Sequence, residues 1–231
     1  MPLQKELKSE IEKYCNNHLP PDSWYEDEFS VIQDANLKKR IIAEFKSIRF
    51  AYKLYEGIGA EGENLMFEVR NQILAYASIY EVVIENVIDT YYSNTPEFES
   101  LMYHEMPIRI DIPERKQCEL QSALSHDGKT IAPYYFAKKK KEKAKVRFDE
   151  KCSTAEKLGL IHKYVNERGE EIDLPAEIKE IYSYRNGIHI LAEQRKGITY
   201  ELDLSKRAYR RMRPFIDQIK ERLIADGKLS S

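Results

Sequence analysis

ENLMFEVRNQILAYASIYEVVIENVIDTYY, residues 63–92, is the stretch of sequence that decides the fold. Its apolar side chains recur at intervals of three and four residues, so they share one face of an α-helix. Polar residues occupy most other positions, as in a helix that packs one side against a core. We therefore expect the long central helix of a helical bundle, with a buried face made of Met66, Val69, Ile73, Tyr76, Ala77, Tyr80, Ile84, Val87, Ile88 and Tyr91.

An acidic row runs beside this apolar face. Glu81, Glu85 and Asp89 repeat every four residues, with no Lys or Arg between them. Like charges at this spacing slightly destabilise an isolated helix, because they are neighbours on its surface. The row predicts either cationic groups facing the helix or a ridge of carboxylates held in solvent.

Two shorter helical patterns precede the central stretch, one over residues 3–15 and one over residues 37–55. Each carries apolar residues at helical spacing and a polar back, and each ends at prolines or glycines. We expect residues 1–59 to form an N-terminal helical arm and residues 60–231 to form the bundle. The predicted fold class is all-α.

The segment that follows the central helix has no regular helical period. Prolines interrupt it, and the alternation of Ile108, Ile110 and Ile112 is typical of a short extended stretch. We expect a short β-hairpin or extended segment within the helical fold, and an inserted basic segment near residues 134–147.

The inserted segment joins aromatic and basic residues. Tyr134, Tyr135 and Phe136 come directly before a run rich in lysine. Lysines can follow the phosphates of a nucleic acid while aromatic rings offer stacking surfaces for its bases. Such a run is also typical of a solvated helix or a mobile loop. The candidate RNA-binding residues here are Lys138, Lys139, Lys140 and Lys141.

The C-terminal part predicts two more helices. A Leu-Pro pair at residues 174–175 opens one that continues to about His189, and Ser205 can cap the last one. Pro214 lies within the last helical pattern and requires a kink or a fresh start. Between the two helices, alternating apolar residues over 198–204 predict a short extended return.

The last helix carries a second basic cluster, in which Arg207, Arg210 and Arg211 fall within one turn. Guanidinium groups suit both phosphate oxygens and carboxylates. These arginines can bind an RNA backbone, or they can pair with the acidic row inside the bundle or across a dimer. We favour the second interpretation.

The composition limits the classes of protein that fit. The 231 residues carry a formal net charge of −2, so affinity for nucleic acid has to come from local basic patches. With 42% hydrophobic and 33% charged residues, and only 9 glycines and 9 prolines, the chain is neither disordered nor collagen-like. Its length fits one substantial domain, or one domain with an extra helical arm.

The cysteines and the N-terminus indicate the compartment. Three widely spaced cysteines without a CxxC pair predict neither a disulfide framework nor a zinc site. The N-terminus lacks an apolar signal core, and no stretch approaches the ~18–20 apolar residues of a membrane span. The five histidines lack metal-ligand spacing, and no phosphate-binding GxxxxGK[ST] motif occurs. We expect a cytoplasmic protein with no metal, no cofactor and no membrane partner.

One segment has a catalytic character: YSYRNGIH, residues 182–189. It resembles the Arg-Asn…His signature of the HEPN superfamily, helical-bundle proteins that include metal-independent ribonucleases of toxin, phage-defence and CRISPR systems. The order of elements is also similar, with a long helix holding the Tyr80-Glu81 pair, a capped STAEKL segment, the Arg-Asn helix, an extended return and a terminal helix. Together they cover roughly residues 60–225. The resemblance implies a HEPN-like helical bundle with additional N-terminal helices.

The resemblance also implies a role for each residue of the site. In metal-independent RNA cleavage a 2′-hydroxyl attacks the adjacent phosphate, while His189 transfers the proton and Arg185 stabilises charge on the phosphoryl oxygens. Asn186 would position the imidazole or a phosphate oxygen, and Glu81 would orient Arg185 if the two helices pack face to face. Two protomers of the family commonly join their Arg-His helices in one composite site. The resemblance therefore implies a homodimeric endoribonuclease of a toxin or anti-phage system, with RNA as substrate and an antitoxin or defence partner.

The motif also has structural interpretations. Three residues separate Arg185 from His189, fewer than is usual in the family, so the site is either re-aimed or degenerate. On a regular helix, residues four apart still share one face. Arg185 can instead pair with the acidic row, Asn186 can cap a helix, and His189 can be an ordinary residue of the fold. The alternative function is a catalytically inactive HEPN-like RNA-binding or regulatory module, and a third is a helical scaffold outside that family.

Overall fold

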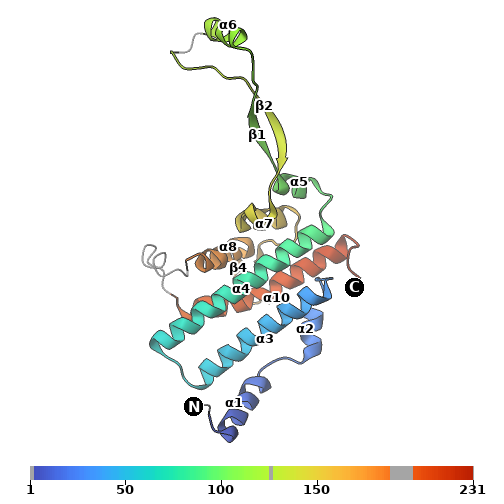
Figure 1. Ribbon diagram of the computed structural model, residues 1–231. Coiled ribbons are helices and arrows are strands. Elements are labelled where there is room, and N and C mark those ends of the chain that lie inside the picture. The colour runs from blue at the N-terminus through green and yellow to red at the C-terminus, as the bar shows by residue number, and fades with distance from the viewer. Residues whose placement is uncertain (1–2, 125–126, 188–199, 231) are drawn as a thin grey trace. The chain divides into compact units, whose positions relative to one another are not determined.

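The structure, a computed structural model, describes residues 3–124, 127–187 and 200–230 (Figure 1). These residues are mostly helical and include two small two-stranded sheets, which confirms the all-α class. The chain divides into two compact units. Residues 1–93 and 148–231 form the helical unit, and residues 94–147 form the hairpin unit.

Three helices begin the helical unit: α1 (Lys5–Asn17), α2 (Asp22–Glu28) and α3 (Ala35–Gly57). The Asp34 side chain caps α3, because it accepts hydrogen bonds from the backbone N–H groups of Asn36 and Leu37 at 2.8 and 3.0 Å. Phe45, on the buried face of α3, packs edge-on against Tyr25 of α2, with ring centroids 6.0 Å apart. Apolar burial thus joins α2 and α3.

α4 (Gly62–Tyr91) is the long central helix that the apolar stripe predicts. Tyr76 and Tyr80 on this stripe have no solvent exposure, and Ile84 is 1% exposed. Figure 1 shows α3 lying along α4, and both belong to the same compact unit. The boundaries of the two compact units fall at 93/94 and 147/148.

The C-terminal part of the helical unit contains α7 (Phe148–Lys157), β3 (Tyr164–Val165), β4 (Glu171–Ile172), α8 (Leu174–Arg185) and α10 (Leu202–Ala225). β3 and β4 pair antiparallel, and both α8 and α10 pack against α4. The Tyr80 hydroxyl of α4 donates to the Ala208 carbonyl of α10 at 2.7 Å, and the Tyr80 ring meets Phe215 edge-on. These contacts join α4 and α10 in the core.

α10 begins earlier than the sequence indicated. Leu202 and Leu204 lie in its first turns, so the expected extended return is wrong for them, and positions 188–199 are outside the described residues. Apolar residues two apart can both border the buried side of a helix, which explains the misleading alternation. Ser205 is buried within α10, and its hydroxyl donates to the Leu202 carbonyl at 3.0 Å instead of capping the helix. α10 also continues through Pro214 without a fresh start.

The starts of α7 and α8 differ in how well the sequence predicted them. α7 begins at Phe148, so Ser153, the first residue of the STAEKL segment, lies inside that helix, and the expected cap at the start of this segment is wrong. Its hydroxyl oxygen instead accepts a hydrogen bond from Lys179 Nζ at 3.0 Å. α8 starts as predicted, with Pro175 in its first turn, and the Asp173 side chain accepts a hydrogen bond from the backbone N–H of Ala176 at 3.1 Å.

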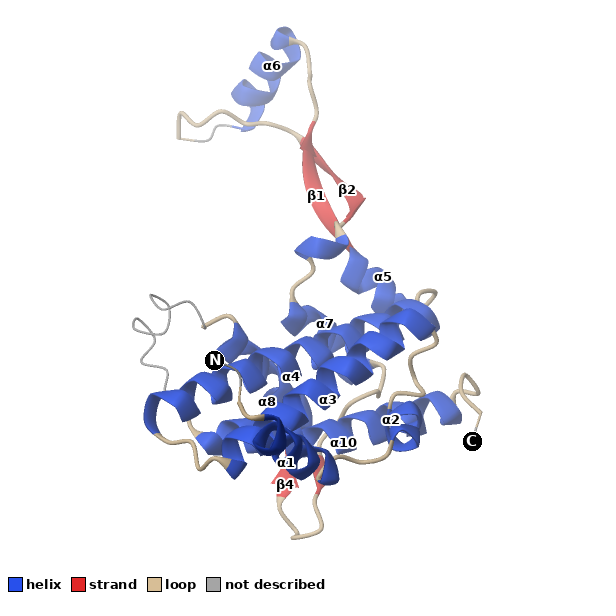
Figure 2. Cartoon of the chain, turned by 60° about the horizontal axis from the view of Figure 1, so that its bottom comes forward, coloured by secondary structure: helices blue, strands red, loops and turns tan. Residues whose placement is uncertain are grey.

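The hairpin unit contains α5 (Pro96–Met102), β1 (Tyr103–Arg109), α6 (Glu114–Leu124), β2 (Tyr134–Lys140) and the short 3₁₀ helix η1 (Lys143–Lys145). β1 and β2 are antiparallel, with Tyr103 opposite Lys140, which confirms the short β-hairpin. Figure 2 shows α6 beyond the end of the hairpin that lies away from α5. Ile108 lies in β1, whereas Ile110 and Ile112 follow it, so the strand begins and ends earlier than the isoleucine alternation indicated.

Candidate functional site

The packing of α8 on α4 brings two of the predicted site residues together. Glu81 Oε2 on α4 and Arg185 Nη1, in the last turn of α8, form an ion pair across 104 positions of sequence. α8 is fixed there by Ile178 and Ile181, which have no solvent exposure. The contact that an orienting role for Glu81 requires is therefore present in the fold.

Tyr182 links the two charged groups. Its hydroxyl lies 3.1 Å from Glu81 Oε1 and 2.9 Å from Arg185 Nη1, so it donates to the carboxylate and accepts from the guanidinium. Its ring stacks on Phe148 of α7, with centroids 4.0 Å apart and planes at 22°. Burial, followed by the charge of Glu81, raises the pKa of Tyr182. The phenol therefore keeps its proton at neutral pH and acts as a donor, not as a base.

Lys151 of α7 brings a second cation to the same place. Its Nζ lies 3.8 Å from Glu81 Oε1 and pairs directly with Glu85 Oε2, and its side chain is only 9% exposed. We call Glu81, Glu85, Lys151, Tyr182 and Arg185 the Glu81 cluster. It balances two carboxylates with two cations. Glu81 and Glu85 thus face cationic groups, one of the two arrangements that the acidic row predicted.

Arg185 keeps part of its guanidinium available. Its side chain is 30% exposed, and among the described residues its hydrogen bonds run from Nη1 alone. A guanidinium carries five N–H donors in a planar fork, so Nε and Nη2 can address another group while Nη1 stays with Glu81. A cation held in this way can stabilise charge on a phosphoryl oxygen.

The helix that carries the motif ends before His189. α8 stops at Arg185, Asn186 is its C-cap, and the backbone N–H of Gly187 donates to the Tyr184 carbonyl at 2.9 Å. The expected helix from Arg185 to about His189 is therefore wrong, because Asn and Gly favour the end of a helix. Asn186 is exposed next to Arg185. His189 lies outside the described residues.

The arginines of α10 are divided between two environments. Arg211 forms a bidentate pair with Glu177 of α8 at 2.6 and 3.2 Å, and Arg207 pairs with Glu180 of α8 at 3.0 Å. These two arginines meet carboxylates inside the unit, as expected, but the carboxylates belong to α8 and not to the acidic row of α4. Arg210 is exposed and lines a pocket.

The lysines of the inserted segment lie on different faces of β2 or just after it. Because successive side chains of a strand point to opposite faces, one face of β2 carries Tyr134, Phe136, Lys138 and Lys140, which we call the hairpin strip. Tyr134 and Phe136 are 53% and 68% exposed. Lys138 pairs with Glu99 of α5, whereas Lys139 lies on the other face and Lys141 follows the strand. The hairpin strip offers aromatic faces and positive charge side by side.

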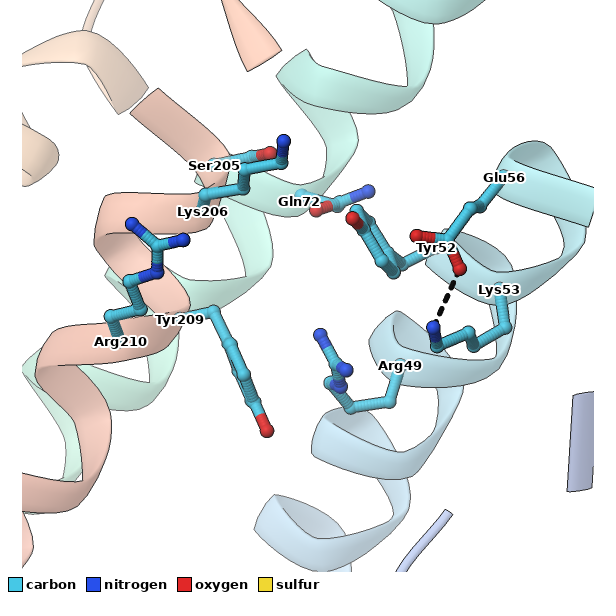
Figure 3. Close-up of a pocket in the computed structure, with 9 residues that line it drawn as sticks. All are labelled: Arg49, Tyr52, Lys53, Glu56, Gln72, Ser205, Lys206, Tyr209 and Arg210. Atoms are coloured by element: carbon cyan, nitrogen blue, oxygen red, sulfur yellow. Dashed lines mark hydrogen bonds and ion pairs between the residues drawn. The ribbon is translucent and has the colours of Figure 1, made fainter. Parts of the chain in front are cut away.

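A pocket of about 220 Å³ lies between α3, α4 and α10 (Figure 3). Of the predicted site residues, only Arg210 lines it. Sequence reasoning missed the pocket because its walls come from three helices that are far apart in the chain. A local signal existed on α3, where Arg49, Tyr52 and Lys53 recur at helical spacing and share one side of the helix.

The part of the chain that the structure describes contains no group of three or more His, Cys, Asp or Glu side chains arranged to hold a metal ion. Its cysteines are free, with Cys15 and Cys152 buried and Cys118 exposed. Nor does any helix within the described ranges combine the length and apolar character required to cross a membrane.

Comparisons with protein-family models, with curated proteins and with solved structures give no match to this chain. The functional conclusion therefore rests on the geometry of the Glu81 cluster and of the two basic surfaces.

Proposed function

We propose that the chain is a HEPN-like, metal-independent endoribonuclease that acts as a homodimer. The observation that carries the proposal is the Arg185 guanidinium, which Glu81 and Tyr182 hold through Nη1 while the side chain stays 30% exposed. A cation that is fixed before the substrate binds stabilises a developing phosphoryl charge without reorganisation. The YRNGIH segment and the order of helices, which resemble the HEPN superfamily, support RNA as the substrate.

The reaction needs a proton acceptor, a proton donor and a stabilised phosphate. His189 takes the proton of an RNA 2′-hydroxyl as that oxygen bonds to the adjacent phosphorus, and the bond from phosphorus to the 5′-oxygen breaks. The leaving 5′-oxygen takes a proton from water, which yields a 2′,3′-cyclic phosphate and a 5′-hydroxyl end. Arg185 neutralises the non-bridging oxygens, and Asn186 donates its amide to one of them or to the imidazole. Glu81 is a positioning residue, because it acts through Arg185.

The hairpin strip supports RNA as the ligand. Stacking of a base on an exposed aromatic ring is worth about 1–3 kcal/mol and tolerates any base, while neighbouring lysines attract the backbone. Lys138, Lys139, Lys140 and Lys141 and the exposed Arg210 are the proposed RNA contacts, whereas Arg207 and Arg211 serve the packing of α10 on α8. The biological setting of the proposal is a toxin or anti-phage system with an antitoxin or defence partner, and it rests on the resemblance alone.

Cleavage of mixed RNA in the presence of EDTA tests the proposal. The wild type is expected to produce cyclic-phosphate ends. Arg185→Ala lowers the rate by about 10²–10³, because it removes a group that stabilises the phosphoryl charge. His189→Ala lowers it by about 10²–10⁴, because it removes the general base. Arg213→Ala is the matched control, because this arginine of α10 is 73% exposed and outside the site. Circular dichroism and size-exclusion chromatography verify the fold and the dimer. Intact RNA with a folded, dimeric wild type overturns the proposal.

A second candidate is a catalytically inactive HEPN-like module that binds RNA or a protein. The observation that favours it is the internal charge balance of the Glu81 cluster, since Lys151 and Arg185 already compensate Glu81 and Glu85. Helix packing then explains the cluster without a substrate. RNA binding that depends on Phe136 and Lys140, combined with no cleavage over a broad panel of RNAs, identifies this function.

A further inference from the structure

The pocket between α3, α4 and α10 lies apart from the proposed catalytic residues, and Arg210 is the one proposed RNA contact that lines it (Figure 3). It shares no residue with the Glu81 cluster or with the hairpin strip. The close-up shows Arg49 and Lys53 on α3, Lys206 and Arg210 on α10, and Gln72 on α4 between the two helices. All of these residues belong to the helical unit, so its packing alone builds the pocket.

Cationic side chains dominate the wall of the pocket. The carboxylate that lines it, Glu56, already forms an ion pair with Lys53 at 2.5 Å. Within residues 3–124, 127–187 and 200–230, no carboxylate lies within ion-pair distance, 4.0 Å, of Arg49, Lys206 or Arg210. Three positive charges with no paired carboxylate produce a local potential that attracts an anion, although the whole chain is nearly neutral.

Aromatic rings hold the central cation in place. The guanidinium carbon of Arg49 lies 3.7 Å from the ring centroid of Tyr209 and 5.1 Å from that of Tyr52. Arginine over the face of an aromatic ring is attracted by the ring and keeps the N–H groups at its edge for other partners. Binding an anion here therefore requires little ordering of Arg49, which favours affinity.

The buried polar groups of the pocket oppose an anion only weakly. Gln72 is 3% exposed and donates from Nε2 to Glu68 Oε1 at 3.0 Å, which places the Glu68 carboxyl one helical turn along α4. Burial raises the pKa of Glu68, so its charged form is disfavoured there. The neutral form of this carboxyl, which burial favours, opposes an anion less than a carboxylate does.

The size and charge of the pocket select the class of ligand. Its volume of about 220 Å³ is below the ~300–1,000 Å³ of sites for drug-sized molecules, so it fits one phosphate with a small attached group. Arginine can bind a phosphate through two parallel hydrogen bonds, and several cations suit a terminal phosphate, with its two charges, better than a diester with one. We propose that this pocket binds a terminal phosphomonoester, carried either by a small molecule or by the end of an RNA.

Calorimetric titration of the full chain with ribose 5-phosphate tests the proposal. Ribose 5-phosphate is expected to bind, ribose is not, and inorganic phosphate competes. The double substitution Lys206→Ala with Arg210→Ala weakens binding at least about tenfold, because each charge-assisted hydrogen bond is worth about 1.5–3 kcal/mol. Arg213→Ala, on the same helix but outside the pocket, leaves the affinity unchanged. Thermal unfolding confirms that both variants are folded.

A second titration distinguishes the sources of the phosphate. A 2′-O-methyl oligoribonucleotide, which cannot be cleaved through its 2′-oxygen, is compared with a 5′-phosphate and with a 5′-hydroxyl. A preference for the 5′-phosphate that the double substitution abolishes assigns an RNA end, whereas binding of ribose 5-phosphate without that preference assigns a small molecule.

The proposal is overturned if neither probe shows a phosphate-dependent affinity, or if that affinity persists in the double variant. Arg185→Ala is expected to leave phosphate binding intact, because Arg185 belongs to the Glu81 cluster and not to the pocket wall. A failure of the proposed nuclease activity and a failure of the pocket are therefore separate results.

Discussion

Glu28, on α2, allows a quantitative test of how the N-terminal helices pack. Its side chain is 4% exposed, and its Oε1 atom has no hydrogen-bond partner among the described residues. Burial, followed by the charge of Asp217, raises the pKa of Glu28 to about 7 from an ordinary value of 4.5, against the opposing effect of Lys220 and Arg213. We expect Glu28→Gln, which keeps the shape of the side chain and cannot ionise, to stabilise the protein at high pH.

The sign and the size of the effect follow from proton linkage. Below about pH 4.5 the carboxyl is protonated in both the folded and the unfolded chain. Between pH 4.5 and 7 the unfolded chain loses this proton while the folded chain keeps it, so the free energy of unfolding falls as the pH rises, and above about pH 7 it levels off. At ~1.36 kcal/mol per pH unit the total loss approaches ~3 kcal/mol.

Urea unfolding of the wild type and of Glu28→Gln at pH 5 and pH 8 measures this effect. The substitution is expected to raise the free energy of unfolding by about 2–3 kcal/mol more at pH 8 than at pH 5. Glu26→Gln is the matched control, since Glu26 lies on the same helix with 58% of its side chain exposed. An equal effect of Glu28→Gln at the two pH values, or a loss of stability at pH 8, refutes the reasoning.

Three further substitutions test the core, the Glu81 cluster and the hairpin strip. Tyr80→Phe removes the donor to the Ala208 carbonyl and is expected to lower the free energy of unfolding by about 1–2 kcal/mol in urea; no loss contradicts a net stabilising role of this hydrogen bond. Lys151→Met leaves Glu85 without its cation and Glu81 with Arg185 alone, and it costs about 1–3 kcal/mol, with partial recovery when Glu85→Gln is added. Phe136→Ala, at a 68% exposed ring, weakens binding of single-stranded RNA by about 1–3 kcal/mol and leaves the thermal unfolding of the helical unit unchanged; unchanged RNA affinity excludes stacking on this ring.

The sequence predicts best those elements whose burial follows one period. The stripe from Met66 to Tyr91 repeats at helical spacing because α4 packs against α3, α7, α8 and α10, and the structure confirms the helix nearly residue for residue. The start of α8 was equally clear, since Asp173 and Pro175 act through the backbone of their own turn. Local chemistry of this kind can be read from the chain without knowledge of the fold.

The ends and starts of helices that depend on tertiary contacts are predicted less well. Ser205 resembles a cap in the sequence, but the core buries it inside α10, and the preceding leucines extend the helix to Leu202. The end of α8 at Arg185 had a local signal in Asn186 and Gly187, yet the apolar residues beyond it favoured a longer helix. In both cases the local pattern fits a longer or a shorter helix, and packing against the neighbouring helices decides where the helix begins or ends.

The candidate site was predicted in part for the same reason. The four-residue repeat of the acidic row left two alternatives, facing cations or a solvated ridge, and Arg185 is one of the cations that the structure places against it. The pairing of Arg211 with Glu177 spans 34 positions. No local signal predicts it, because α10 carries several arginines and lysines and the sequence does not distinguish the one that meets Glu177. Three helices that are far apart in the sequence form the walls of the phosphate pocket, so no single segment of the sequence predicts it.

The nearly neutral charge of the whole chain conceals local differences, because cations are paired with carboxylates in some places and less completely in others. Inside the helical unit, the Glu81 cluster and the contacts between α8 and α10 pair each cation with a carboxylate. At the hairpin strip Lys138 pairs with Glu99, and aromatic rings next to the lysines remain exposed. Salt screens exposed charges more strongly than partly buried pairs. Rising ionic strength is therefore expected to weaken RNA binding before it weakens the packing of α8 on α4. The slope of the logarithm of the RNA affinity against the logarithm of the salt concentration gives the number of phosphates that the basic surfaces neutralise.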